Sequence, residues 1–144
     1  MGDTGTWLPW ALASAVFAAL TAVFAKTGLE GIDSDFATLM RTGMIAVVLG
    51  VFVYALGKWR DPMALPRRSL AFLALSALTT GGSWVCYFRA LKVGEASRVA
   101  PVDKLSVVLV AVFATLFLGE HPSPRDWFGI AMVTAGVVVL AWRR

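Results

Sequence analysis

Apolar residues fall into five long runs that short polar stretches separate. The runs occupy about residues 7–26, 36–57, 69–91, 97–119 and 124–142. About 20 consecutive apolar residues in a helix cross the roughly 30 Å hydrocarbon core of a bilayer, so each run predicts a transmembrane helix. Almost nothing is left between the runs. The sequence therefore predicts one transmembrane domain over residues 1–144, with no soluble domain.

Two other readings of this pattern are set aside. Strands of a membrane barrel alternate apolar and polar residues, whereas the stretch 11–20 is apolar at nearly every position. A cleaved signal peptide begins with basic residues, but the segment before the first run carries Asp3 and neither lysine nor arginine. We therefore expect an all-α membrane protein, a five-helix bundle whose first helix is retained.

Composition supports this class and narrows the chemistry. Hydrophobic residues make up 58% of the chain and charged residues 15%, against about 45–50% and about 25% in soluble domains. One cysteine, Cys86, and one histidine, His121, exclude an intrachain disulfide and make a Cys/His metal cluster untenable. Glu120, His121 and Asp126 form the one local cluster that could suggest a membrane enzyme, and a solvated turn explains them better. We expect neither a cofactor nor enzymatic activity.

The net charge of +4 bears on orientation in the membrane. In a soluble chain it could indicate nucleic acid, but here the basic residues lie in loops, so we expect no nucleic-acid partner. Five spans place the termini on opposite sides. Five basic residues then share the side of the N-terminus and six the other side: Lys58, Arg60, Arg67, Arg68 and Arg125 against Lys26, Arg89, Lys92, Arg98, Arg143 and Arg144. Because orientation follows lysine and arginine, this balance suggests insertion in both directions.

The third run carries polar side chains at helical spacing. Ser76, Thr80, Ser83 and Tyr87 recur at intervals that place them on one helix face, and Trp84 flanks that face. Polar residues within a membrane need a reason. One reason is the wall of a solute cavity, and the other is close helix packing, for which serine and threonine are common.

The first run has a stripe of small residues on one face, which includes Ser14 and Ala18. Small residues let two helix backbones approach closely, so packing is the favoured role. Such a wall also leaves room for a solute, and Ser14 and Ala18 are therefore included among the candidate cavity residues.

Charges enter the second and fourth runs. Asp103 and Lys104 lie in the first third of the fourth run, Ser106 shares a helix face with Asp103, and Arg41 lies at a similar depth in the second run. A charge inside a bilayer is costly unless it is paired. Two pairings are open, Arg41 with Asp103 or Lys104 with Asp103, and Asp103 alternatively caps a helix. Asp103 and Ser106 are also candidates for contact with the solute or a proton.

The last run contains two glycines on one face. Gly129 and Gly136 lie seven positions apart, which returns to the same side of a helix. Glycine notches let another backbone come close. A partner helix in a second protomer is the favoured occupant, and packing within the same chain is the alternative.

Two segments resemble the EamA domain of the drug/metabolite transporter superfamily. Residues 84–106 (WVCYFRALKVGEASRVAPVDKLS) look like its third-to-fourth helix junction, and residues 116–136 (LFLGEHPSPRDWFGIAMVTAG) look like its fourth-to-fifth junction. Most members carry two such domains as inverted repeats, so this chain resembles a half-size member. The resemblance implies a transporter in a prokaryotic cytoplasmic membrane. Inverted-repeat transporters bind solute near the midplane between the repeats.

A half-size member needs a second half. The resemblance implies an antiparallel homodimer with the cavity between protomers, or alternatively a heterodimer with a paired EamA subunit. The chain is also more distantly similar to the small multidrug resistance family, whose last helix carries a comparable glycine heptad for dimer contact. The first-helix glutamate on which that family depends corresponds to Ala18 here, counting back from Lys26, so proton-coupled drug export by that route is doubtful.

The predicted function is transport of a small metabolite or amphiphilic solute. A non-transporting membrane scaffold is the alternative from another class. It predicts that no solute stabilises the purified protein.

Overall fold

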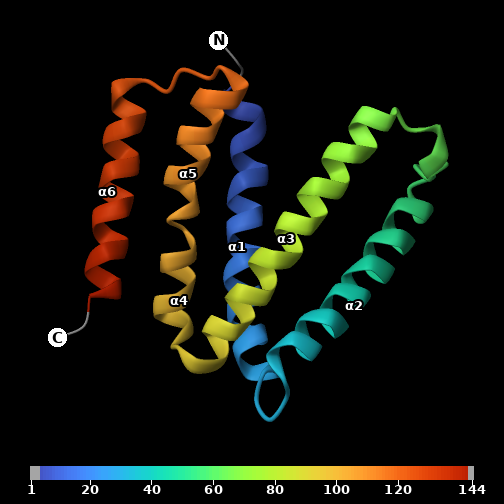
Figure 1. Cartoon of the computed structure of the whole chain (residues 1–144), viewed down its shortest axis with the longest axis horizontal. Coiled ribbons are helices and arrows are strands. Elements are labelled where there is room, and N and C mark those ends of the chain that lie inside the picture. The colour runs from blue at the N-terminus through green and yellow to red at the C-terminus, as the bar shows by residue number, and fades with distance from the viewer. Residues whose placement is uncertain (1–3, 143–144) are drawn as a thin grey trace. The chain divides into compact units, whose positions relative to one another are not determined.

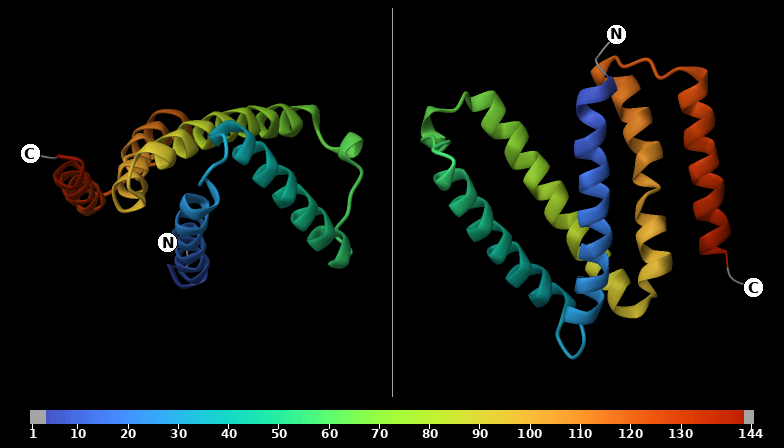
Figure 2. Two further views of the ribbon diagram at one scale, coloured as in Figure 1. Left: turned by 90° about the horizontal axis from the view of Figure 1, so that it is seen from below. Right: turned by 180° about the vertical axis from the view of Figure 1, so that it is seen from behind.

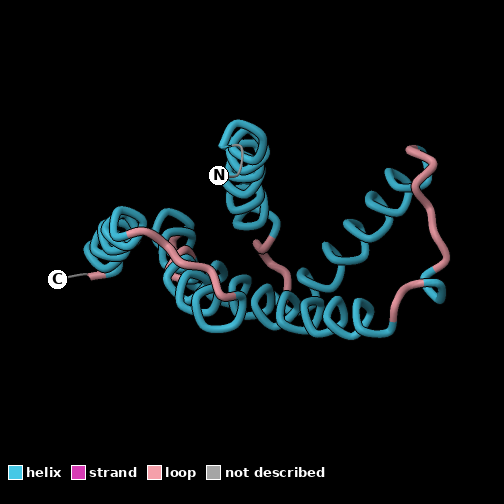
Figure 3. Tube along the Cα trace, turned by 90° about the horizontal axis from the view of Figure 1, so that it is seen from above, coloured by secondary structure: helices cyan, strands magenta, loops and turns pink. Residues whose placement is uncertain are grey.

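The computed structural model describes residues 4–142, and nearly all of this segment is helical (Figures 1 and 3). Its longer helices are α1 (Thr4–Gly28), α2 (Ser34–Ala55), α3 (Arg67–Val93) and α6 (Pro124–Ala141). The fourth apolar stretch contains α4 (Ala96–Asp103), α5 (Ser106–Phe113) and the π-turn η2 (Ala114–Leu118), and a short 3₁₀ turn, η1 (Pro62–Ala64), precedes α3. No strand occurs among the described residues, which confirms the predicted all-α class.

Five stretches of helix are long and apolar enough to span a bilayer. They are Trp7–Gly28, Ser34–Ala55, Arg67–Val93, Ala96–Leu118 and Pro124–Ala141. Few of their residues are buried within the chain, and none is buried in the most apolar 18 residues of the third stretch. Large apolar side chains that cover most of a surface require lipid or partner helices around them. The chain is thus an integral, multi-pass membrane protein.

Local sequence explains where several helices begin. Asp33 precedes α2, and its carboxylate accepts hydrogen bonds from the backbone N–H groups of Asp35 and Phe36, both at 3.0 Å. At α6, Ser123 and Asp126 cap each other's backbone N–H groups at 3.3 and 2.8 Å, and Pro124 occupies the first helical position. These caps satisfy donors that a helix start leaves unpaired.

The fourth predicted helix, 97–119, is divided rather than continuous. Pro101 cannot donate a backbone hydrogen bond, and the chain tightens after it. The N–H groups of Lys104 and Leu105 donate three residues back, to Pro101 and Val102, both at 3.0 Å. Gly119 then ends η2 with a φ of 67°, a left-handed conformation that glycine adopts without strain.

The described helices form two compact units, one up to Val93 and one from Gly94. In the first, α2 and α3 pack together and α1 contacts α3, close to the turn that follows α1 (Figures 1 and 2). In the second, α5 continues the direction of α4, and α6 lies alongside both (Figure 1).

The core of the first unit lies where its three helices meet. Leu91 is fully buried, and Leu29 and Phe88 are each 3% exposed. Ser34 and Thr38 of α2 are buried beside them, and the Thr38 hydroxyl donates to the Ser34 carbonyl oxygen at 2.8 Å. This end of α1, α2 and α3 is therefore the best-packed part of the unit.

Replacing Leu91 with alanine should lower the free energy of unfolding in detergent by about 2 kcal/mol. This is the lower end of the range for buried leucine, because acyl chains replace water as the competing surroundings. Leu78→Ala is the matched control, since Leu78 lies on the same helix and is 73% exposed. Equal shifts in the unfolding midpoint for the two variants would contradict this placement of the core.

Candidate solute-binding site

Polar contacts hold α1, α2 and α3 together at the buried end of the first unit. The Lys26 ammonium donates to the Leu91 carbonyl oxygen at 2.6 Å, and the Lys92 ammonium donates to the carbonyl oxygen of Ile32. Leu91 lies in the last turn of α3, where carbonyl groups lack partners in the helix, so the lysine supplies a missing donor.

An ion pair joins α2 and α3 at the same end. The guanidinium of Arg89 donates two hydrogen bonds to the Asp35 carboxylate, at 2.8 and 2.5 Å. Such a two-point contact fixes orientation as well as distance, because the planar donor matches the planar acceptor. It also means that the charge of Asp35 is already matched.

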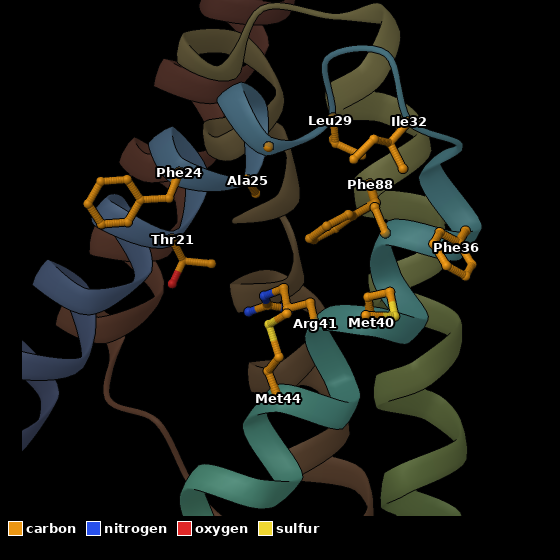
Figure 4. A pocket seen from close by; sticks show the side chains of 12 residues that line it. Thr21, Phe24, Ala25, Leu29, Ile32, Phe36, Met40, Arg41, Met44 and Phe88 are labelled. Carbon is orange, nitrogen blue, oxygen red and sulfur yellow. The ribbon is translucent and has the colours of Figure 1, made fainter.

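A pocket of about 450 Å³ opens between α1 and α2, beside the core residue Phe88 of α3 (Figure 4). The lining residues are Thr21, Phe24, Ala25, Gly28, Leu29, Ile32, Phe36, Ala37, Met40, Arg41, Met44 and Phe88. Two of these side chains are polar, the hydroxyl of Thr21 on α1 and the guanidinium of Arg41 on α2. Mostly apolar walls with a few polar groups are typical of small-molecule sites.

Arg41 is positioned by aromatic rings of α3. Its guanidinium carbon lies 4.6 Å from the centre of the Trp84 ring and 5.3 Å from that of Phe88. Contact with ring faces attracts a cation, by about 2 kcal/mol where water is excluded. Within residues 7–93 no carboxylate lies within 4 Å of the Arg41 nitrogens. The arginine is therefore supported by rings rather than by an acid of its own unit.

The predicted polar face of α3 is divided by burial. Ser76, Thr80 and Ser83 are exposed, whereas Trp84 and Tyr87 are half-buried towards the end that packs against α2. Of this set, the structure brings Trp84 into ring contact with Arg41 and places Tyr87 where it interacts electrostatically with Arg41. The three hydroxyl residues lie on a part of α3 that the first unit leaves open.

On α1, Ser14 and Ala18 are exposed and lie outside the pocket. The pocket begins one turn later, at Thr21. The assignment of Ser14 and Ala18 to a solute cavity stays a prediction.

In the second unit, Asp103 and Lys104 lie at the break between α4 and α5. The Lys104 ammonium is 3.4 Å from the Asp103 carboxylate, so one of the two pairings left open by the sequence is present. Adjacent residues of a regular helix point about 100° apart, and the contact accompanies the tightened turn at this position. Ser106 is the first residue of α5 and is exposed. An Arg41–Asp103 pair would join two separate units and stays a prediction.

Gly129 and Gly136 lie on α6 and are exposed. A Cβ atom added at either glycine would meet no heavy atom of residues 94–142 within 4 Å. The notched face of α6 is thus unoccupied by its own unit.

The pocket contains residues that the sequence analysis did not assign to a site. Phe24 on α1 and Met40 and Met44 on α2 are apolar and gave no chemical signal by themselves. Their spacing was a usable signal, since Thr21, Phe24 and Gly28 share one face of α1, as do Phe36, Met40 and Met44 on α2. Without knowing which helices meet, however, those faces are indistinguishable from lipid-facing ones.

No group of three or more histidine, cysteine, aspartate or glutamate side chains is placed to hold a metal ion in the part of the chain that the structure describes. The donor chemistry of the pocket is one guanidinium and one hydroxyl, which suits binding of a polar or anionic group.

Comparison with known proteins gives one family and several relatives. The model of the EamA-like transporter family matches residues 5–142. An uncharacterized transporter in the cobO 3′ region of Sinorhizobium sp. is 57% identical over 136 residues, which cover 94% of this chain and 96% of that protein. A probable 4-amino-4-deoxy-L-arabinose-phosphoundecaprenol flippase subunit ArnE from Yersinia pestis (strain Pestoides F) is 31% identical over 87 residues, 58% of this chain and 75% of that protein. No solved structure matches the chain significantly.

Proposed function

Since the chain belongs to the EamA-like transporter family, we propose that it carries a small metabolite or amphiphilic solute across a prokaryotic cytoplasmic membrane as an antiparallel dimer. The family match confirms the resemblance seen in the two helix junctions, and the five apolar helices agree with it. The solute cavity lies between the two protomers.

The observation that carries this proposal is the open polar face of α3. Ser76, Thr80 and Ser83 are exposed within a helix long and apolar enough to cross a membrane. Hydroxyl groups facing acyl chains are unfavourable, so the face favours a partner helix or a solute pathway over lipid. A second copy placed against it encloses a cavity lined by these hydroxyls.

The antiparallel arrangement is supported by two features of the chain. Lysine and arginine are balanced between the two sides of the membrane, so the signal that normally fixes one orientation is weak. A half-size chain that builds an inverted-repeat transporter also needs one copy in each orientation.

A second candidate is that the chain is one subunit of a heterodimeric transporter. It is favoured by the relatives named as flippase subunits. In that case the partner supplies the opposite orientation, and the purified chain alone forms no active unit.

The transport proposal is tested with purified protein in liposomes. We expect at least one small amphiphilic metabolite both to raise the unfolding temperature and to cross the bilayer in a protein-dependent way. If a broad ligand screen gives neither a thermal shift nor flux, the transport proposal is wrong and the alternative of a non-transporting scaffold is favoured.

Insertion in both orientations gives a separate prediction. We expect a single cysteine added after the C-terminus, in a Cys86→Ser background, to react with a membrane-impermeant maleimide from the outside of intact cells in about half of the molecules. The remainder reacts only after permeabilisation. Adding three lysines to the loop 58–66 should shift the population towards one orientation. If the chain without the added lysines is labelled from one side only, the antiparallel homodimer is excluded.

A further inference from the structure

We propose that the pocket between α1 and α2 binds the anionic headgroup of an amphiphile at Arg41, with its aliphatic tail along the apolar wall. The inference names a substrate class, and for its physiological role it rests on the proposed transport function. It concerns a site within one chain, distinct from the polar face of α3 between protomers.

The charge of Arg41 lies within a helix long and apolar enough to span the membrane. Arg41 lies seven residues after Ser34, the first residue of α2, or about 10 Å along the helix. Arginine keeps its charge in proteins, and a charge held at membrane depth marks a pathway or a binding site more often than a structural accident. The residue is half-buried and lines the pocket.

Arg41 has no negatively charged partner among the residues that line the pocket. The rings of Trp84 and Phe88 attract the guanidinium but offer no lone pairs, so they do not replace an oxygen acceptor for its N–H groups. The Tyr87 phenol also interacts electrostatically with Arg41, but it is not a carboxylate and does not line the pocket. The lining contains no carboxylate, and the nearby Asp35 is engaged by Arg89. Figure 4 shows the Arg41 nitrogens directed towards the α1 side of the pocket, where Thr21 lies. An anion placed there accepts from the guanidinium and from the Thr21 hydroxyl.

The rest of the pocket is mostly apolar and is large enough for a small ligand. Phe24, Phe36, Met40, Met44 and Phe88 supply broad apolar walls, and methionine adapts to tails of different shapes. The volume of about 450 Å³ lies within the usual range of about 300–1,000 Å³ for small ligands. An inorganic anion alone leaves these walls uncovered, while a cationic amphiphile brings its charge against Arg41. The observations therefore favour an amphiphile with a phosphate or carboxylate headgroup.

The test uses the full chain in nanodiscs of phosphatidylcholine, whose headgroup carries no net charge. Binding of radiolabelled dodecyl phosphate is measured by equilibrium dialysis, with empty nanodiscs giving the background from partition into lipid. We expect saturable binding that neither dodecyltrimethylammonium, dodecyl maltoside nor inorganic phosphate displaces at matched concentration. Displacement by the cation or the maltoside would overturn the assignment of an anionic headgroup. Displacement by inorganic phosphate would assign the site to a soluble anion and overturn the assignment of an amphiphilic ligand.

Variants then locate the binding. Arg41→Met removes the charge and keeps apolar volume, and we expect about tenfold weaker binding or more, as for loss of charge-assisted hydrogen bonds. Arg41→Gln should weaken binding similarly. The matched control is Arg68→Met, since Arg68 lies over Phe72 at 6.0 Å on α3, outside the pocket, and should leave the affinity unchanged. Equal losses in the Arg41 and Arg68 variants would overturn the site. The headgroup comparison needs only the native chain and decides even if the Arg41 variants fail to fold.

Flux measurements separate this inference from the transport proposal. If dodecyl phosphate binds at Arg41 but no solute crosses the bilayer, the Arg41 site is supported and the transport proposal is wrong. If Arg41→Met leaves the flux of a transported solute unchanged, transport stands and does not depend on the Arg41 site. If Arg41→Met leaves the binding of dodecyl phosphate unchanged, the Arg41 site is overturned.

Discussion

Replacing both Gly129 and Gly136 with leucine is expected to convert the proposed dimer into monomers and to abolish transport. Each leucine fills a notch on the face of α6 that is expected to meet the partner helix, and overpacking of a close contact costs about 1–3 kcal/mol per site. Both copies of a homodimer carry both leucines, so dimerisation is expected to weaken by about 30-fold or more. The protomer itself should tolerate the change, because a Cβ at either glycine meets nothing within 4 Å among residues 94–142.

The measurement is the mass of the protein–detergent complex by light scattering, together with flux in liposomes. Ala131→Leu is the matched control, because Ala131 lies two residues after Gly129, about 200° around the helix, and is also exposed. It should remain dimeric and active. A double glycine variant that stays dimeric would exclude α6 as the protomer contact. A native chain that is monomeric when purified alone would favour the heterodimer.

Replacing Trp84 with alanine is expected to lower the rate of solute transport by about tenfold or more. Trp84 holds the Arg41 guanidinium at 4.6 Å from its ring centre, and a desolvated contact of this kind contributes about 2 kcal/mol. Loss of the ring also opens a void next to the pocket, so Arg41 no longer has one position. Tyr87→Ala should weaken transport less, because Tyr87 is half-buried beside Phe88 and lies outside the pocket lining.

Transport is measured as initial flux in liposomes at equal protein content, after checking that each variant remains folded. Trp84→Phe keeps an aromatic face and should retain most of the activity. Trp59→Ala removes an exposed tryptophan outside the pocket and should have no effect. If Trp84→Phe is as inactive as Trp84→Ala, the role of the ring as a support for Arg41 is wrong.

Much of the fold could be predicted from the sequence, because the bilayer imposes a length and a polarity that can be read locally. The five spans followed from runs of about 20 apolar residues, and the start of the last run at residue 124 agrees with the start of α6 at Pro124. The family followed from the residues around Trp84–Ser106 and Leu116–Gly136. Each of these features is a property of neighbours along the chain.

The break between α4 and α5 was not anticipated, although its cause is local. Pro101 was visible, but a proline in a membrane helix produces either a kink or a continuous helix, depending on what satisfies the freed backbone groups. Here three-residue backbone hydrogen bonds at Lys104 and Leu105 close the turn.

The sequence by itself determined that this is an integral membrane protein and how many helices span the bilayer. It also determined that Arg41 and the hydroxyl groups of α3 need polar or packing partners within the membrane. Only the tertiary structure decided that Arg41 lies against Trp84 and Phe88 and that a pocket forms between α1 and α2. The physical reason is that lipid and protein interiors are equally apolar, so hydrophobicity does not distinguish a face that packs from one that meets acyl chains. That choice depends on which helices meet, and here it follows from contacts between residues more than 50 positions apart, such as Asp35 with Arg89 and Lys26 with Leu91.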